Sequence, residues 1–138
     1  MKTIEIELRR IENCNAWLWG ELIIEGVKYC DSLEFGSGIE IKQGLYKLKS
    51  CFGKITRIQY IMIFDLEDTF FSSFVRHNNI MFYDIELRLE NNYISLGKKK
   101  GSAHLINSES IYYKFLKYIE NLIENGFQVN LRVNDMYF

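Results

Sequence analysis

Three consecutive lysines between Gly97 and Gly101 form one compact basic cluster: Lys98, Lys99 and Lys100. Lysines beside glycines can bind phosphate, but a P-loop needs a glycine-rich loop that leads into a helix, with Lys followed by Ser or Thr. That order is missing, and the nearest predicted helix begins several residues later. We therefore interpret the lysines as a solvated turn. Nucleotide or nucleic-acid binding through this patch, with Lys54 and Arg57, is kept as an alternative.

Cysteine and histidine are the residues that would supply a nucleophile and its base. The three cysteines are Cys14, Cys30 and Cys51, and none lies beside either histidine, His77 or His104. No CxxC or HExxH spacing is present, so we expect no metal site. Buried structural thiol is the default interpretation of Cys30 and Cys51. An enzyme with relocated catalytic residues would use Cys51 and His77.

Carboxylates cluster at Asp65, Glu67 and Asp68. Such a set can hold Mg²⁺ or Ca²⁺, but the glycine and terminal glutamate of an EF-hand loop are absent. We interpret this segment as an acidic surface loop, and we expect no cofactor.

Aromatic residues make up 15% of the chain. Trp17 and Trp19 share one face of a predicted strand, whereas Phe70, Phe71 and Phe74 lie in a predicted loop. Exposed aromatics can anchor a partner, or they can cap a core. Because one helix covers only part of a small sheet, leftover aromatic surface predicts a protein partner or self-association. A small ligand is the alternative.

Length and charge narrow the class of protein. A chain of 138 residues has the usual size of one domain, 1–138. A net charge of −1 and a pI near 6.1 argue against a dedicated nucleic-acid binder. The odd cysteine count fits a reducing compartment, and no apolar run resembles a signal peptide or membrane span. We expect a cytoplasmic location, in a host cytosol if the chain is phage-encoded, or a place in a virion.

Mostly β-strands are predicted around these residues. Alternation over 3–11 indicates a half-buried strand, and Glu25-Gly26 indicates the turn of a hairpin. Two short strands are expected around Gly44, and an apolar run marks a buried strand at 58–64. One amphipathic helix is expected at about 108–125, with Gly126 ending it and a last strand following. The fold class is α+β, mainly β: a twisted antiparallel sheet or a small barrel or sandwich with one C-terminal helix.

The segments "WGELIIEGVKYCDSLE", "IEIKQGLYKL", "YISLG" and "LINSESIYYKFLKYI" resemble a phage- and prophage-associated domain family of unknown function. Its members open with a Gly-x-Leu-x-Ile/Val-x-Gly hairpin, a Cys and a Leu-Glu pair, and continue with Ile-x-x-Gly-x-Tyr. They close with a Ser-x-x-x-aromatic-x-x-Leu helix and a strand. The matching residues are Gly20, Leu22, Ile24, Gly26, Cys30, Leu33, Glu34, Ile41, Gly44, Tyr46, Ile94, Leu96, Gly97, Ser108 and Leu116.

The family also carries a His and a Gly-Cys that look like those of L,D-transpeptidases, where a cysteine thiolate attacks peptidoglycan stem peptides. Here Asn92, Tyr93 and Ile94 stand where Gly-Cys-Ile would fall, and "IMFYD" stands where the histidine would fall, near Phe82. A phenol with a pKa near 10 is a poor substitute nucleophile. The resemblance therefore implies a degenerate transpeptidase-like scaffold that acts by binding, as a virion accessory component or a modulator of a host factor. A cysteine-dependent peptidoglycan hydrolase or transpeptidase is the alternative.

Overall fold

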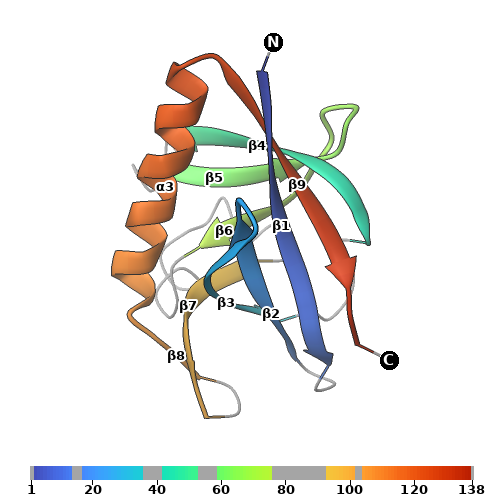
Figure 1. Ribbon diagram of the computed structural model, residues 1–138, viewed down its shortest axis with the longest axis vertical. Helices are drawn as coiled ribbons and strands as arrows, with labels where there is room; N and C mark the ends of the chain where they lie inside the picture. The colour runs from blue at the N-terminus through green and yellow to red at the C-terminus, as the bar shows by residue number, and fades with distance from the viewer. Residues whose placement is uncertain are drawn as a thin grey trace.

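The computed structural model describes residues 2–13, 17–35, 42–52, 59–75, 93–101 and 104–137 (Figure 1). It confirms an α+β fold that is mainly β, with one helix near the C-terminus and a last strand after it. The elements are β1 (Lys2–Asn13), β2 (Trp17–Ile24), β3 (Val27–Phe35), β4 (Gly44–Phe52), β5 (Gln59–Phe64), β6 (Phe70–Val75), β7 (Tyr93–Lys100), β8 (His104–Ile106), α3 (Ser108–Glu124) and β9 (Phe127–Asp135).

Eight of the strands close into a ring. Of the three architectures that the sequence leaves open, an open sheet, a barrel and a sandwich, the structure is therefore the barrel. The order of the strands in the ring is β3-β2-β1-β9-β4-β5-β6-β7, and β7 pairs back onto β3. The ring is mixed: β1 runs parallel to β9 and β6 parallel to β7, while the other neighbours are antiparallel. Strand β8 lies outside the ring, as a hairpin partner of β7.

Two local predictions are wrong, and a third falls partly outside the described residues. The segment Phe70–Val75 is strand β6, paired with both β5 and β7, and not a loop. The three lysines continue β7 and pair with β8, so they are not a solvated turn. The second of the two short strands expected around Gly44 is present as β4, whereas residues 36–41, where most of the first would lie, are outside the described part. In both wrong predictions, pairing with an adjacent strand makes a β-strand of residues whose composition alone does not indicate one.

The core fills the barrel and extends to one face of α3. Alternation in β1 points Ile6 and Leu8 inward, and in β9 it does the same for Val129, Leu131 and Val133. Phe115 and Ile119 of α3 are fully buried in the same cluster as these inward side chains. Figure 1 shows α3 along one side of the barrel, where it closes the interior.

The β2–β3 hairpin turns at Glu25 and Gly26, as the sequence predicts. Both residues have positive φ, 52° and 79°, which is the type I′ pattern that matches the twist of paired strands. In the described part of the chain, no helix has the length and apolar character needed to cross a membrane.

Candidate binding groove beside β4

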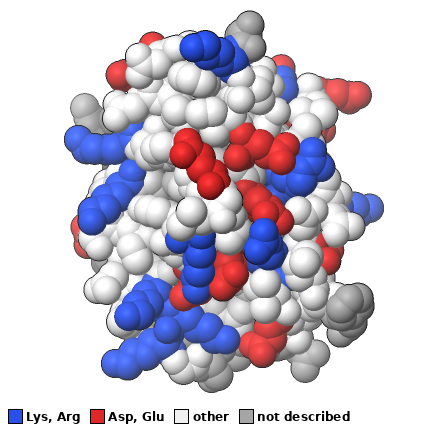
Figure 2. Space-filling model, viewed as in Figure 1, with Lys and Arg blue, Asp and Glu red and all other residues white. Residues whose placement is uncertain are grey.

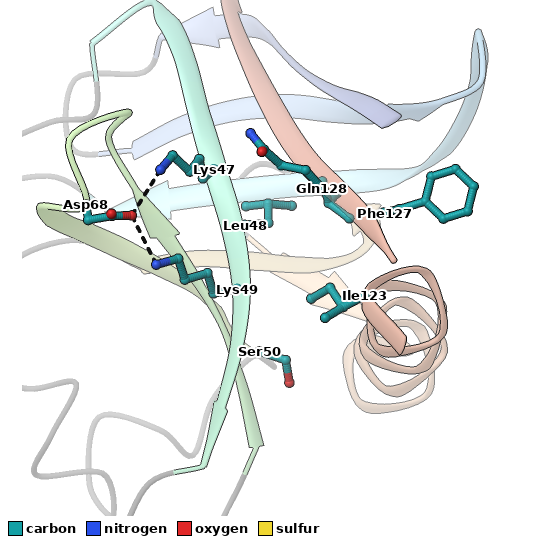
Figure 3. A pocket seen from close by; sticks show the side chains of 9 residues that line it. Lys47, Leu48, Lys49, Ser50, Asp68, Ile123, Phe127 and Gln128 are labelled. Atoms are coloured by element: carbon teal, nitrogen blue, oxygen red, sulfur yellow. Dashed lines mark hydrogen bonds and ion pairs between the residues drawn. The ribbon is translucent and has the colours of Figure 1, made fainter. Parts of the chain in front are cut away.

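A groove of about 470 Å³ runs beside β4 where this strand separates from β9 and the end of α3 (Figure 3). We call it the β4 groove. Its size lies in the range typical of small-molecule sites. It is lined by Lys47, Leu48, Lys49, Ser50, Asp68, Ile123, Phe127, Gln128 and Val129.

Two ammonium groups at the groove converge on one carboxylate oxygen. Nζ of Lys47 lies 3.1 Å and Nζ of Lys49 lies 3.0 Å from Oδ1 of Asp68. The hydrogen bonds from Lys49 and then Lys47 hold the pKa of Asp68 below its usual value. Lys49 also lies over the ring of Phe64, 4.8 Å from its centroid. The three charges leave the cluster with one net positive charge.

Strand alternation and a tight turn bring these groups together. Lys47 and Lys49 lie on one face of β4, and Leu48 between them is buried on the other. Asp68 comes from the β5–β6 turn, where its φ of 67° is left-handed. Oδ1 of Asp65 accepts the backbone N–H groups of Glu67 and Thr69, both at 2.8 Å, and so fixes that turn.

The groove has an apolar side toward α3 and a charged side toward Asp68. Figure 3 shows Ile123 of α3 pointing across toward Leu48 of β4, while the side chains of the lysines reach Asp68 on the far side of the strand. Ser50 and Gln128 add a hydroxyl and an amide. Among the described residues that line the groove, none is a cysteine or a histidine. Leu48 and Val129 are only 3% and 1% exposed, so the accessible apolar surface comes mainly from Ile123, which is 38% exposed. The arrangement is suited to hold an organic anion whose apolar part lies against Ile123.

Two of the predicted aromatic binding residues are buried. Trp19 is 2% exposed and packs with Leu33 and Leu105 beneath the β7–β8 hairpin. Phe74 is fully buried and meets Phe115 edge-on, with ring centroids 5.2 Å apart. Both therefore stabilise the fold instead of offering exposed surface. The side chains of Trp17, Phe70, Phe71 and Tyr93 lie outside the described part of the structure.

The predicted lysine patch is exposed, yet Lys99 is engaged by neighbouring elements. Its ammonium lies 4.8 Å from the centroid of the Trp19 ring and 3.5 Å from Oε1 of Glu12. Its backbone N–H donates to Oδ2 of Asp31 at 2.7 Å. Figure 2 shows basic side chains gathered at the end of the molecule where the β7–β8 hairpin lies. Lys54 and Arg57 lie outside the described residues, so the structure does not extend this patch to them.

The predicted alternative enzyme pair falls outside the described part of the structure, which includes neither His77 nor the side chain of Cys51. Cys30 is buried, as predicted, inside the barrel. Burial raises the pKa of its thiol to about 12, despite an opposing hydrogen bond with the Gly97 backbone. A thiol with that pKa is not a nucleophile near neutral pH. Within the described ranges, no group of acidic, histidine and cysteine side chains is arranged to hold a metal ion.

One further cluster, inside the barrel, has no counterpart in the predicted sites. Arg10 is 2% exposed, and its Nε and Nη2 donate to the two carboxylate oxygens of Glu34 at 3.0 and 2.8 Å. Its Nη1 donates to Oδ1 of Asp135 at 3.2 Å. Burial alone would lower the pKa of Arg10, but Glu34 and Asp135 outweigh it and raise that pKa. This cluster ties the ends of β1, β3 and β9 together.

Sequence reasoning missed Lys47, Lys49, Ser50 and Gln128 as site residues. A signal for the lysines was present, since they alternate with Tyr46 and Leu48 on a predicted strand. Nothing local indicated that Asp68 would meet them, because that contact joins β4 to a turn beyond β5. Comparisons of the chain with protein-family models, curated proteins and solved structures found no match.

Proposed function

We propose that this protein is a non-catalytic binding protein of the phage or prophage type, and that it holds an organic anion in the β4 groove. The observation that carries the proposal is the convergence of Lys47 and Lys49 on one oxygen of Asp68, in a groove that is also lined by the exposed side chain of Ile123. An incoming carboxylate or phosphate takes over hydrogen bonds that Asp68 now accepts. Hydrogen bonds to charged groups are among the stronger ones in proteins.

The non-catalytic part of the proposal is supported by the sequence and by Cys30. At the positions where the resemblance would put the catalytic Cys and His of a transpeptidase, this chain has neither residue. The described thiol, Cys30, has a pKa near 12. The phage-type assignment is supported by the sequence resemblance, which covers most of the chain.

The ligand class follows from charge and shape together. One net positive charge at the rim favours a singly charged anion over a neutral molecule or a cation. The exposed apolar side chain of Ile123 in the lining favours an aliphatic or aromatic body over a bare inorganic ion. A carboxylate on a short aliphatic chain is the simplest molecule with both properties.

Isothermal titration with hexanoate tests the proposal. Two controls are matched to it: 1-hexanol keeps the alkyl chain without the charge, and acetate keeps the carboxylate without the chain. We expect hexanoate to bind with a Kd on the order of 0.1–10 mM, as its size permits, and more tightly than either control. Replacing both lysines (Lys47→Met and Lys49→Met) should weaken hexanoate at least tenfold. The control variant, Lys98→Met with Lys100→Met, removes the same charge elsewhere and should leave the affinity unchanged. If hexanoate affinity falls equally in the two double variants, the effect is due to net charge alone and the proposed site is refuted.

The same preparations should be incubated with peptidoglycan fragments. Turnover of those fragments that disappears on replacing a single cysteine would overturn the non-catalytic assignment and favour the enzyme.

A further inference from the structure

A basic surface runs over the β7–β8 hairpin and along α3. Four lysines on these elements are exposed, Lys98 and Lys100 of β7 and Lys114 and Lys117 of α3, and we call them the basic strip. Figure 2 shows basic side chains at the end of the molecule where the hairpin lies and again along the side where α3 lies. None of the four lines the β4 groove, so the strip is a separate surface.

The charges of the basic strip are not neutralised by their surroundings. Lys28, Lys47 and Lys99 each have a carboxylate oxygen within 3.5 Å of Nζ. Among the described residues, no carboxylate holds any of the four strip lysines in this way. Segment 98–119 contains five lysines and one carboxylate, Glu109. The chain as a whole carries a net charge of −1, so its positive charge is concentrated on this segment.

The hairpin is fixed to the barrel through one face and presents Lys98 and Lys100 on the other. On the barrel side, the ammonium of Lys99 lies 4.8 Å from the centroid of the Trp19 ring. The backbone N–H of Lys99 donates to Oδ2 of Asp31 at 2.7 Å. Because side chains alternate along a strand, Lys98 and Lys100 point away from that contact. Their backbone is thus held in place before any partner binds.

The spacing of the strip lysines suits a regular row of negative charges. Lys98 and Lys100 are two residues apart on an extended strand, which separates them by about 7 Å. Lys114 and Lys117 are neighbours on the helix surface, with Cβ atoms about 5–6 Å apart. Successive phosphates of one nucleic-acid strand are separated by a similar distance. A DNA duplex carries one negative charge about every 1.7 Å of its axis, which makes it a dense partner for such a strip.

The apolar residues favour a nucleic acid over a membrane surface. Helices that lie on membranes insert an apolar face beside their charges. In the described part of the hairpin and α3, the large apolar side chains that are exposed are Tyr113 and Ile123, and Ile123 lines the β4 groove. Trp19, which could stack on a base if it were exposed, is buried under the hairpin. The strip therefore offers ammonium groups for phosphates and little that could read bases.

We propose that the basic strip binds the phosphate backbone of double-stranded nucleic acid without reading its sequence. The lysines of β7 contact phosphates at one end of the strip, and those of α3 contact phosphates further along. Binding releases counterions from the duplex, so the affinity depends steeply on salt. A single carboxylate such as hexanoate meets one exposed lysine at a time and is not held here. This site is independent of the β4 groove.

Fluorescence anisotropy of a labelled DNA duplex of mixed sequence, titrated with the whole chain at low salt, tests the proposal. We expect the logarithm of the affinity to fall with the logarithm of the salt concentration with a slope of about −3 to −4. Lys98→Met with Lys100→Met, and separately Lys114→Met with Lys117→Met, should each weaken binding at least about tenfold and reduce the slope by about 2.

The matched control is Lys47→Met with Lys49→Met, which removes the same charge from the β4 groove and should leave the salt slope unchanged. No saturable binding of the duplex at low salt, or equal losses in all three double variants, would overturn the proposal.

Two other polyanions distinguish the source of the negative charge. Polyglutamate carries carboxylates on a polypeptide, and vesicles that contain phosphatidylserine carry their charge on a membrane surface. At equal concentrations of negative charge, we expect the duplex to bind at least about fivefold more tightly than either. Equal or tighter binding of polyglutamate or of the vesicles would overturn the assignment to nucleic acid.

Discussion

Two charge clusters of opposite composition lie in contrasting surroundings. Inside the barrel, Arg10 is held by the carboxylates of Glu34 and Asp135. At the β4 groove, Lys47 and Lys49 share the carboxylate of Asp68. Arg10 is 2% exposed, whereas the Asp68 side chain is 56% exposed. The buried charge needs every one of its partners, while the exposed one can exchange its partner for a ligand or for water.

Stability should therefore depend on the first cluster and binding on the second. A buried ion pair is costly to break, because the partner left behind keeps its charge without solvent or counter-charge. An exposed pair contributes little to stability, because water and salt screen it. Each of the following variants tests one side of this contrast.

The largest effect is expected from Arg10→Met, which removes the positive charge that faces the buried carboxylate of Glu34 inside the barrel. We expect it to lower the free energy of unfolding by about 3–5 kcal/mol, measured by urea denaturation at neutral pH. Adding Glu34→Met removes the stranded charge and should restore most of that loss. If Lys47→Met with Lys49→Met destabilises the protein as much as Arg10→Met does, the contrast between the clusters is wrong.

Gly20 provides the space beside the buried cluster, since it pairs with Arg10 across β1 and β2. A Cβ at this position would lie 2.7 Å from the carbonyl oxygen of Arg9 and 2.7 Å from Oγ of Ser32. We expect Gly20→Ala to lower the free energy of unfolding by about 1–3 kcal/mol through overpacking. Thermal denaturation measures this.

Ser32→Ala in the Gly20→Ala background provides the control, because Oγ of Ser32 is buried without a hydrogen-bond partner in the described residues. It should recover part of the stability by removing one of the two close contacts. An unchanged or worse double variant would show that Ser32 makes a favourable contact.

Cys30 shows how burial in the barrel changes the pKa of a side chain that belongs to neither charge cluster. Burial raises its pKa from an ordinary value of 9.0 to about 12. Between pH 9 and pH 12 the thiol is ionised in the unfolded chain but still protonated in the folded protein. The free energy of unfolding should therefore fall as the pH rises from 9 toward 12, and this thiol should not affect it below pH 9.

Urea denaturation at pH 8 and pH 11 measures that difference, with Cys30→Ala as the control. The wild type should lose about 2–3 kcal/mol more than the variant over this interval. Equal losses would place the thiol in an environment that does not disfavour its charge.

The smallest effect is expected at Asp68, and it has the opposite sign. Asp68→Asn leaves both lysines without a competing carboxylate, and asparagine tolerates the left-handed φ of 67°. We expect hexanoate affinity to increase about threefold, as measured by isothermal titration at low salt. A decrease would mean that Asp68 positions the lysines for the ligand and does not compete with it.

The sequence was most informative where structure is local. The helix from residue 108, the Glu25-Gly26 turn and the inward face of β9 follow from periodicity and turn chemistry. Arg10 was also detectable, because it continues the inward series of Ile6 and Leu8. Its partners were not, since Glu34 is 24 and Asp135 is 125 residues away in sequence.

The strand Phe70–Val75 does not follow from its sequence for another reason: its residues, FFSSFV, lack apolar–polar alternation, although one of its two partners, β5, is its neighbour along the chain. Trp19 was predicted as a candidate anchor because alternation identifies a face but not what covers it. Here the cover is the β7–β8 hairpin, which contributes Leu105. Gly97 permits that packing, because a Cβ there would lie 2.9 Å from the Ile106 carbonyl oxygen.

The proposed binding function is tested most directly by following the side-chain resonances of the groove during titration with hexanoate. The account predicts that the Nζ signals of Lys47 and Lys49 and the methyl signals of Ile123 shift together, with a single Kd. It also predicts that the signals of Lys98 and Lys100 stay in place. Shifts confined to Lys98 and Lys100, or equal at all four lysines, would contradict an anion site in the β4 groove.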